Sequence, residues 1–183
     1  MSPTANDERL LKALAVATVN RPRATLKELA EAAGVSKATL HRFCGTRDNL
    51  VKMLEHYGKT VLKQTIAAAD LERTEPLAAL RILIGEHLKH RELLVFLMFQ
   101  YRPDTFGPEA EDRYWQSYMD ALDAFFLRGQ QQGVLRIDIS AVVLTELFTT
   151  LIYGMVDAER RGRAASASSA NTLEQMFLHG AAT

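Results

Sequence analysis

The chain has 183 residues, 48% of them hydrophobic, and its 22 Lys and Arg balance its 22 Asp and Glu. This length supports one domain or a small domain joined to a larger one, and the apolar content excludes extended disorder. Glycine and proline are sparse, at ten and five residues, so an all-α fold is favoured over a sheet-based one. The lone cysteine, Cys44, excludes a disulfide framework and a cysteine-based zinc cluster.

The N-terminus and the apolar runs predict a cytoplasmic protein without membrane association. Asp7, Glu8 and Arg9 interrupt the first ten residues, which excludes a secretory signal. The longest strictly apolar run is Leu93–Phe99, and Ala141–Val156 is interrupted by one glutamate and three threonines. Neither run reaches the roughly 20 apolar residues that a bilayer requires.

Helical periodicity runs through most of the chain and predicts about nine helices. It breaks at residues 20–24, 34, 45, 73–76, 102–108, 131–138 and 162–170. Thr25 with Glu28 has the spacing of a capping box, and Thr46 is suited to cap the long helix that follows it. The Ser- and Ala-rich stretch RGRAASASSA at 161–170 is predicted to be a linker between two helical segments.

Charge is distributed unevenly along the chain. Residues 21–47 hold six Lys and Arg against two glutamates, a net charge of +4, so the remainder carries −4. One compact basic segment in a neutral chain indicates a local anionic partner.

The basic segment contains the pattern of a helix-turn-helix, LKELAEAAGVSKATL at residues 26–40. Ala30 is small where two helices must cross, Gly34 suits a tight left-handed helix end, and Ser36 can cap a second helix. In a helix-turn-helix the second helix enters the major groove of DNA. An ordinary helical hairpin can show the same spacing, but the basic enrichment favours DNA binding.

The run AGVSKATLHRFCGTRDNL at residues 33–50 resembles the TetR family of bacterial transcriptional regulators. His41 and Cys44 stand where that family commonly has tyrosine and phenylalanine. The resemblance implies an all-α homodimer, with a DNA-binding domain at residues 1–50 and a ligand-sensing and dimerisation domain at 51–183. It also implies a ligand site between the long fourth helix and the helices after it, and repression as the usual outcome.

The second helix of the motif has a core face and an outer face. Positions 40 and 44 share one face, which assigns Leu40 and Cys44 to the core and favours a buried, inert cysteine over a redox-active one. On the outer face, Lys37, Ala38 and Thr39 are predicted to read base edges.

The remaining expected DNA contacts are to phosphate. Thr25 and Arg47 stand at helix starts, where free amides and the helix dipole suit anions. The full expected set is Thr25, Lys37, Ala38, Thr39, His41, Arg42 and Arg47. The alternative for the basic members is a solvated charged face.

Aromatic, histidine and methionine residues between positions 50 and 129 are typical of a mostly apolar pocket with a few polar groups. The predicted lining is Met53, His56, Tyr57, His87, Phe96, Phe99, Tyr114, Trp115 and Tyr118, and the predicted effector is a small apolar or aromatic molecule. Core packing produces the same pattern and remains an alternative. His87 and His90 are spaced to share a helix face, but surface histidines explain them better than a metal site, so neither metal nor cofactor is expected.

The last two helical segments are predicted to form a homodimer interface. Their apolar residues recur at helical spacing; the expected contacts are Leu144, Leu147, Phe148, Leu151, Ile152, Met155, Leu173, Met176 and Phe177. Such a pair can complete an isologous four-helix bundle, and packing within one chain is the alternative.

These features predict a repressor that binds a pseudo-palindromic operator in double-stranded DNA as a dimer and is released by a small effector. A non-specific architectural DNA-binding protein is one alternative, but it would need basic charge spread more widely. A small helical enzyme is another. It has no support from a GxSxG, GxxxxGK[ST], HExxH or paired ExxH motif, so the chain is not expected to be an enzyme.

Overall fold

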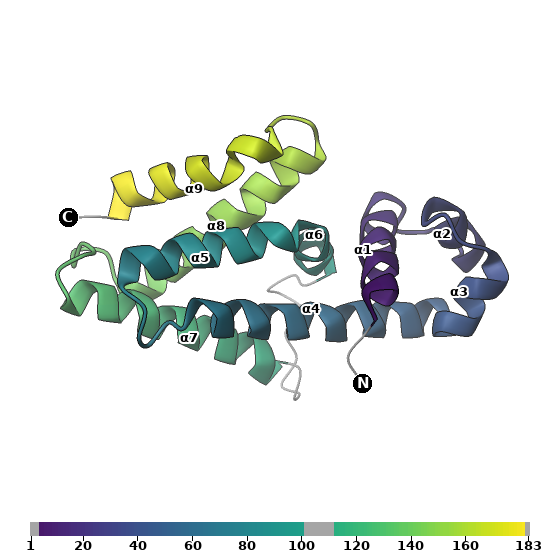
Figure 1. Cartoon of the computed structure of the whole chain (residues 1–183), viewed down its shortest axis with the longest axis horizontal. Helices are drawn as coiled ribbons and strands as arrows, with labels where there is room; N and C mark the ends of the chain where they lie inside the picture. The colour runs from purple at the N-terminus through teal and green to yellow at the C-terminus, as the bar shows by residue number, and fades with distance from the viewer. Residues whose placement is uncertain (1–3, 101–111, 182–183) are drawn as a thin grey trace. The chain divides into compact units, whose positions relative to one another are not determined.

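The computed structural model describes residues 4–100 and 112–181, with side chains described for residues 4–98 and 115–180. Within these ranges the chain forms nine α-helices and no β-strand (Figure 1), which confirms the predicted all-α class. The helices are α1 (Ala5–Asn20), α2 (Leu26–Ala32), α3 (Lys37–Cys44), α4 (Arg47–Ala69), α5 (Pro76–Lys89), α6 (Arg91–Gln100), α7 (Asp112–Gln131), α8 (Ala141–Arg160) and α9 (Ser166–Ala181).

The chain divides into two compact units. The first unit comprises Met1–Thr60 and Arg91–Pro103, and the second comprises Val61–His90 and Asp104–Thr183. The sequence suggested a boundary after residue 50, which falls inside α4. Helix α6 belongs to the first unit because it packs against α1, and α4 contributes residues to both units.

Side-chain caps fix where several helices begin. The predicted capping box at α2 is present: the Glu28 amide donates to Thr25 Oγ1 at 3.4 Å, and the Thr25 amide donates to Glu28 Oε2 at 2.7 Å. Thr46 caps α4 as predicted, because its Oγ1 accepts from the Asn49 amide at 3.2 Å. These contacts satisfy amides that have no partner within the helix.

The predicted linker at residues 161–170 is wrong in extent. Helix α9 already begins at Ser166, so only residues 161–165 connect it to α8, with Gly162 at φ +70°. The alanines in this stretch are strong helix formers. The serine hydroxyls also find local acceptors, since Ser169 donates to the Ala165 carbonyl and Ser166 to the Glu159 carboxylate.

The core of the first unit is built from leucines of four helices. Leu14, Leu29, Leu40 and Leu50 are fully buried. Gly58 of α4 lies so close to α6 that a Cβ placed on it would meet the Leu97 Cδ2 atom at 2.9 Å. The glycine therefore allows a close approach between these two helices.

The core of the second unit is organised by three phenylalanines, one each from α7, α8 and α9. The Phe126 ring lies 5.8 Å from that of Phe148 and 5.4 Å from that of Phe177, and the last two are 5.7 Å apart. These separations are favourable for aromatic pairs, and all three side chains are buried. They hold the last three helices together.

Helix α8 is long and apolar enough to cross a membrane by length and composition, with a mean hydropathy of 1.4 over its most apolar window. Its inward face instead supplies Leu144, Phe148, Ile152 and Val156 to the core. Only 33% of that window is buried within the chain. The helix therefore retains an apolar face that this single chain does not cover.

Truncation of Phe126 tests the aromatic core. Phe126→Ala is expected to lower the free energy of unfolding by about 3 to 5 kcal/mol, because it removes a fully buried ring and leaves a cavity. Leu127→Ala is the matched control: Leu127 is 49% exposed, and its truncation is expected to change stability by about 0.5 kcal/mol or less. Urea unfolding at one protein concentration measures the free energy of unfolding of both variants. Equal losses of stability would contradict the assignment of Phe126 to the core.

Candidate DNA interface and sensing core

Helix α3 has the geometry expected of a recognition helix. The turn before it places Gly34 at φ +71°, a conformation that glycine adopts without steric cost. Ser36 caps the helix by accepting from the Thr39 amide at 3.0 Å. Helices α2 and α3 pack together, with Leu29 and Leu40 fully buried.

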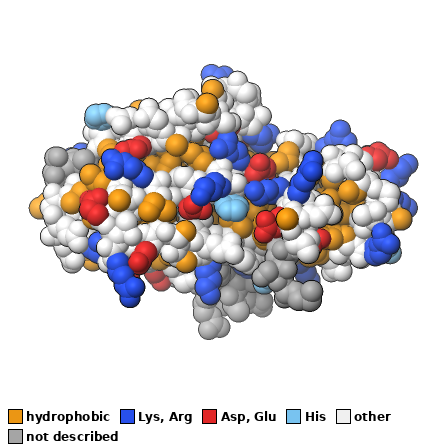
Figure 2. Space-filling model, in the orientation of Figure 1, with side chains coloured by type: hydrophobic (Ala, Val, Ile, Leu, Met, Phe, Trp, Pro, Cys, Tyr) orange, Lys and Arg blue, Asp and Glu red, His pale blue; other side chains and the backbone are white. Residues whose placement is uncertain are grey.

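The outer face of α3 presents most of the predicted contacts to solvent. Lys37, Ala38, His41 and Arg42 are exposed. Thr39 is half-buried, and its hydroxyl lies 2.8 Å from the Ser36 hydroxyl. Figure 2 shows Lys and Arg side chains on the visible surface around α2 and α3. The face combines cationic donors with a small residue, which suits entry into a DNA groove.

Thr25 is less suited to bind phosphate than the sequence suggested. Its amide and its hydroxyl both donate to the Glu28 carboxylate, at 2.7 and 2.8 Å. These hydrogen bonds hold the pKa of Glu28 below its usual value, so the carboxylate is ionised at neutral pH. The start of α2 therefore already carries an anion that satisfies Thr25 and would repel a phosphate.

Arg47 has a structural contact that the sequence did not predict. Its half-buried side chain reaches back to the loop between α1 and α2 and donates from Nη2 to the Pro22 carbonyl at 2.6 Å. Arg21 and Arg23 of the same loop are exposed. The contact joins residues 25 positions apart, so no local sequence pattern could predict it. It places the positive charge of Arg47 next to the basic α1–α2 loop.

Cys44 lies in the core, as predicted from its position on α3. It is 6% exposed, and its Sγ donates to the Leu40 carbonyl at 3.3 Å. Burial raises the pKa of the thiol, which reduces its thiolate fraction and its reactivity.

The residues predicted to line a ligand pocket fall into separate groups. Met53, His56, Tyr57 and Phe96 belong to the first unit, whereas His87, Trp115 and Tyr118 belong to the second. Tyr57, Phe96, His87 and Tyr118 are buried, and His56 is exposed. Phe99 and Tyr114 lie outside the residues whose side chains the structure describes.

The second-unit group forms a buried polar pair inside an aromatic cluster. His87 of α5 donates from Nδ1 to the Leu83 carbonyl at 2.7 Å, so its Nε2 accepts from the Tyr118 hydroxyl at 2.6 Å. Phe148 packs edge-on at 5.8 Å from the His87 ring, and the Trp115 ring lies 5.4 Å from that of Tyr118. Burial lowers the pKa of His87 to about 4, so the imidazole is neutral at pH 7.

A cleft of about 440 Å³ opens elsewhere in the second unit, between the end of α4 and α7. None of the predicted pocket residues lines it; its lining is Ile66, Ala67, Asp70, Leu71, Glu72, Ala121, Ala124, Phe125 and Arg128. The sequence missed this cleft because alanines carry no pocket signal. Within the described residues, no group of three His, Cys, Asp or Glu is arranged to hold a metal ion.

The predicted interface residues divide into two sets. Five of them are buried inside this chain: Leu144, Phe148, Ile152, Leu173 and Phe177. Phe148 and Phe177 are members of the aromatic core. The other four remain at least partly accessible: Leu147, Leu151, Met155 and Met176.

The whole chain is similar to a known transcriptional regulator. No family model matches. The HTH-type transcriptional regulator NfxB of Pseudomonas aeruginosa is 76% identical over 181 residues, covering 99% of this chain and 97% of the relative. The chain belongs to the TetR family of transcriptional regulators.

Solved structures of TetR-family regulators share the fold. The ketosteroid regulator KstR2 of Mycobacterium tuberculosis has a TM-score of 0.78 at 16% identity, covering 98% of this chain and 97% of its own. LfrR of Mycobacterium smegmatis, solved in complex with proflavine, has a TM-score of 0.71 at 20% identity over 96% of both chains. AibR, solved with isovaleryl coenzyme A and operator DNA, has a TM-score of 0.69 at 18% identity, covering 92% of this chain and 96% of its own.

Membership of the TetR family settles the class of function. Because the 76% identical relative is a transcriptional regulator, the family resemblance seen in the sequence is confirmed, as is the prediction that the chain is not an enzyme. The helices α2 and α3 are those predicted from the sequence to form the DNA-binding helix-turn-helix.

The buried imidazole of His87 predicts a pH-dependent stability. Below its ordinary pKa of 6.5, the unfolded chain binds a proton at His87, whereas the folded chain does so only near pH 4. Lowering the pH from 7 to 4 therefore favours unfolding, by about 3 kcal/mol from this group alone.

His87→Gln should remove that contribution from the pH dependence measured by urea unfolding. His179→Gln is the control, because His179 is exposed on α9. An unchanged pH profile in His87→Gln would show that His87 is not buried in its neutral form.

Proposed function

We propose that this regulator is a dimeric repressor that binds a pseudo-palindromic operator in the cytoplasm and is released by a small apolar or aromatic effector. The observation that carries the proposal is the division of α3 into two faces. Leu40 and Cys44 are buried, while Lys37, Ala38 and Arg42 face outward. A helix held in this way can enter a major groove with its outer residues against the bases.

The outer residues of α3 take different roles. Lys37, Ala38 and Thr39 stand in the first turn of α3, the first two exposed and Thr39 half-buried. We assign base reading to these three residues. His41 and Arg42 lie further along the exposed face and are assigned to phosphates, together with Arg47 beside the α1–α2 loop. Phosphate contacts orient the protein, and base contacts give sequence preference.

Dimerisation through α8 and α9 is supported by the uncovered face of α8. Val143, Leu147, Thr150 and Gly154 follow one another at spacings of four, three and four residues, which is the spacing of a helix–helix seam. Val143 and Leu147 are both 46% exposed, and a Cβ placed on Gly154 would meet no atom within 4 Å. A second copy could therefore bring a helix close to α8 at this glycine.

The effector site is proposed in the second unit, around His87, Tyr118 and Trp115. The His87–Tyr118 pair is neutral and lies beside the rings of Phe148 and Trp115, which suits an uncharged or aromatic molecule. The regulators LfrR and AibR, which share this fold, were solved with proflavine and with isovaleryl coenzyme A. A ligand that displaces these side chains could act on DNA binding through α4, since residues of α4 belong to both units.

Substitutions on α3 should separate base reading from phosphate binding. In a selection of bound duplexes from a random pool, the protein is expected to enrich a palindrome whose half-sites are about one DNA turn apart or slightly more. Lys37→Ala or Thr39→Ala should relax the preference at individual positions, at a cost of about 1 to 3 kcal/mol for the preferred base. Arg47→Ala should weaken binding to all duplexes and reduce the salt dependence.

Arg81→Ala provides a control outside the interface, because Arg81 pairs with Glu174 in the second unit, and it should leave DNA binding unchanged. Equal affinity for selected and random duplexes would instead indicate a non-specific architectural protein.

Release by an effector predicts coupled binding. A thermal-shift screen of apolar and aromatic compounds is expected to identify stabilising ligands, and these should lower operator affinity by about 5- to 150-fold, a coupling of about 1 to 3 kcal/mol. Tyr118→Phe should alter ligand affinity while leaving operator affinity without ligand unchanged, since it removes only the hydroxyl bonded to His87. A compound that binds without changing operator affinity would contradict the sensing role.

A further inference from the structure

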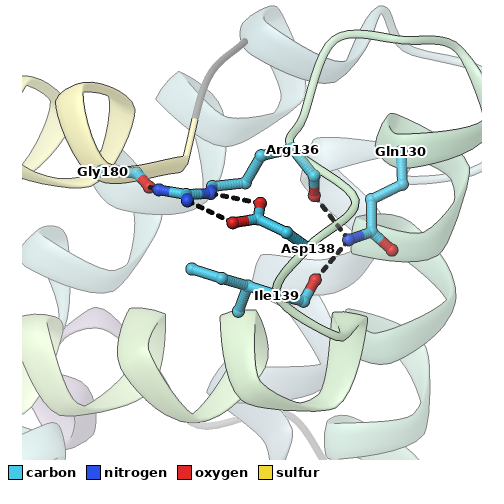
Figure 3. A network of polar contacts seen from close by, with 5 residues as sticks. All are labelled: Gln130, Arg136, Asp138, Ile139 and Gly180. Carbon is cyan, nitrogen blue, oxygen red and sulfur yellow. Dashed lines mark hydrogen bonds and ion pairs between the residues drawn. The ribbon is translucent and has the colours of Figure 1, made fainter.

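The loop between α7 and α8 is held by hydrogen bonds from the side chains of Gln130 and Arg136 (Figure 3). Gln130, near the end of α7, donates from Nε2 to the Arg136 carbonyl at 2.7 Å and to the Ile139 carbonyl at 2.6 Å. These bonds clamp the backbone before and after Ile137. The loop is therefore ordered by a side chain from the preceding helix.

Arg136 adds a second set of restraints to this loop. Its guanidinium donates to both oxygens of the Asp138 carboxylate, at 2.6 and 2.5 Å, and to the Gly180 carbonyl at 3.0 Å (Figure 3). The hydrogen bonds from Arg136 hold the pKa of Asp138 below its usual value, so the pair stays charged at neutral pH. Arg136 thus ties the loop to the last turn of α9 and neutralises the carboxylate beside Ile137.

Ile137 itself points into solvent. Among the side chains that the structure describes, six large hydrophobic residues are exposed, and Ile137 is the most exposed of them at 82%. Four others lie in the first two turns of α8 or on α9: Val142, Val143, Leu147 and Met176. Only Leu127 lies elsewhere, on α7. We name these five residues, Ile137 with the four on α8 and α9, the apolar patch.

The charges around the loop favour a second copy of this chain as the occupant of the apolar patch. Between positions 134 and 147 the charged residues are Arg136, Asp138 and Glu146, and the first two neutralise each other. The remaining negative charge disfavours DNA or an anionic lipid surface. A nearly neutral apolar surface would not repel an identical surface by charge, so it can take part in an isologous interface.

We propose that Ile137 is an anchor that packs against the apolar patch of a second copy, and that Arg136 is the positioning residue that holds this anchor in place. The inference rests on the proposed dimer and extends its interface from the helices α8 and α9 to the α7–α8 loop. A rigid loop loses little conformational freedom on docking, so the anchor can contribute strongly to the dimer. Anchors of this kind typically dominate an interface.

Sedimentation equilibrium of the full chain tests the anchor. The unsubstituted protein is expected to be a dimer, and Ile137→Asp should raise its dissociation constant by about tenfold or more. Leu127→Asp is the matched control, because it places the same charge on an exposed hydrophobic residue outside the apolar patch, and it should change the constant by less than about twofold. Ile137→Thr, which keeps the branched side chain, should act in the same direction as Ile137→Asp but less strongly.

The outcomes separate the two proposals. A monomeric unsubstituted protein would overturn the dimer and the anchor together. A dimer that tolerates Ile137→Asp would overturn the anchor alone and leave dimerisation through α8 and α9 standing. A similar loss in Leu127→Asp would also overturn the anchor, because the effect would not be specific to Ile137.

Arg136→Met tests the positioning role. It should speed hydrogen exchange of the amides in residues 134–140 and raise the dimer dissociation constant by about three- to tenfold. Arg136→Lys should restore part of the affinity, since lysine can meet the carboxylate but lacks the fork that binds both oxygens. Faster exchange with an unchanged dissociation constant would overturn the positioning role.

Discussion

The packing of α3 against α2 is the constraint on which the proposed DNA-binding surface depends. A helix of eight residues is too short to persist in water by itself, and α3 has only eight. Burial of Leu40 against the neighbouring helix, with Gly34 turning the chain between them, determines which residues of α3 face outward. The outer face of α3, which starts at Lys37, is exposed because the opposite face with Leu40 and Cys44 is buried.

The charged residues of the first unit differ in how they are held, although a count of net charge treats them as equal. The basic segment at residues 21–47 was predicted to contact an anionic partner. Lys37 and Arg42 are exposed, so both side chains can reach such a partner. Glu28 and Arg47 are both held in place by hydrogen bonds, Glu28 to the nearby Thr25 and Arg47 to the distant Pro22 carbonyl. The net charge of the segment therefore overstates the positive charge available at the start of α2.

Several elements of the fold and the site were predictable because their causes are local. The capping box at Thr25, the cap at Thr46 and the turn at Gly34 each involve residues within four positions, and the structure contains all three. The predicted linker at residues 161–170 was too long because its alanines favour helix and its serines find acceptors nearby. The helix propensity of the alanines was present in the sequence, but the many serines made the stretch resemble a linker.

By itself, the sequence determined the all-α class, the helix-turn-helix and the family, since periodicity, caps and motif spacing are properties of neighbouring residues. Only the tertiary structure decided which apolar residues serve the core and which remain for a partner. Phe148 and Leu147 are adjacent and equally apolar, yet the first packs on Phe126 and the second is 46% exposed. That choice depends on which face of α8 meets α7 and α9, and distant segments, not neighbours along the chain, supply those contacts.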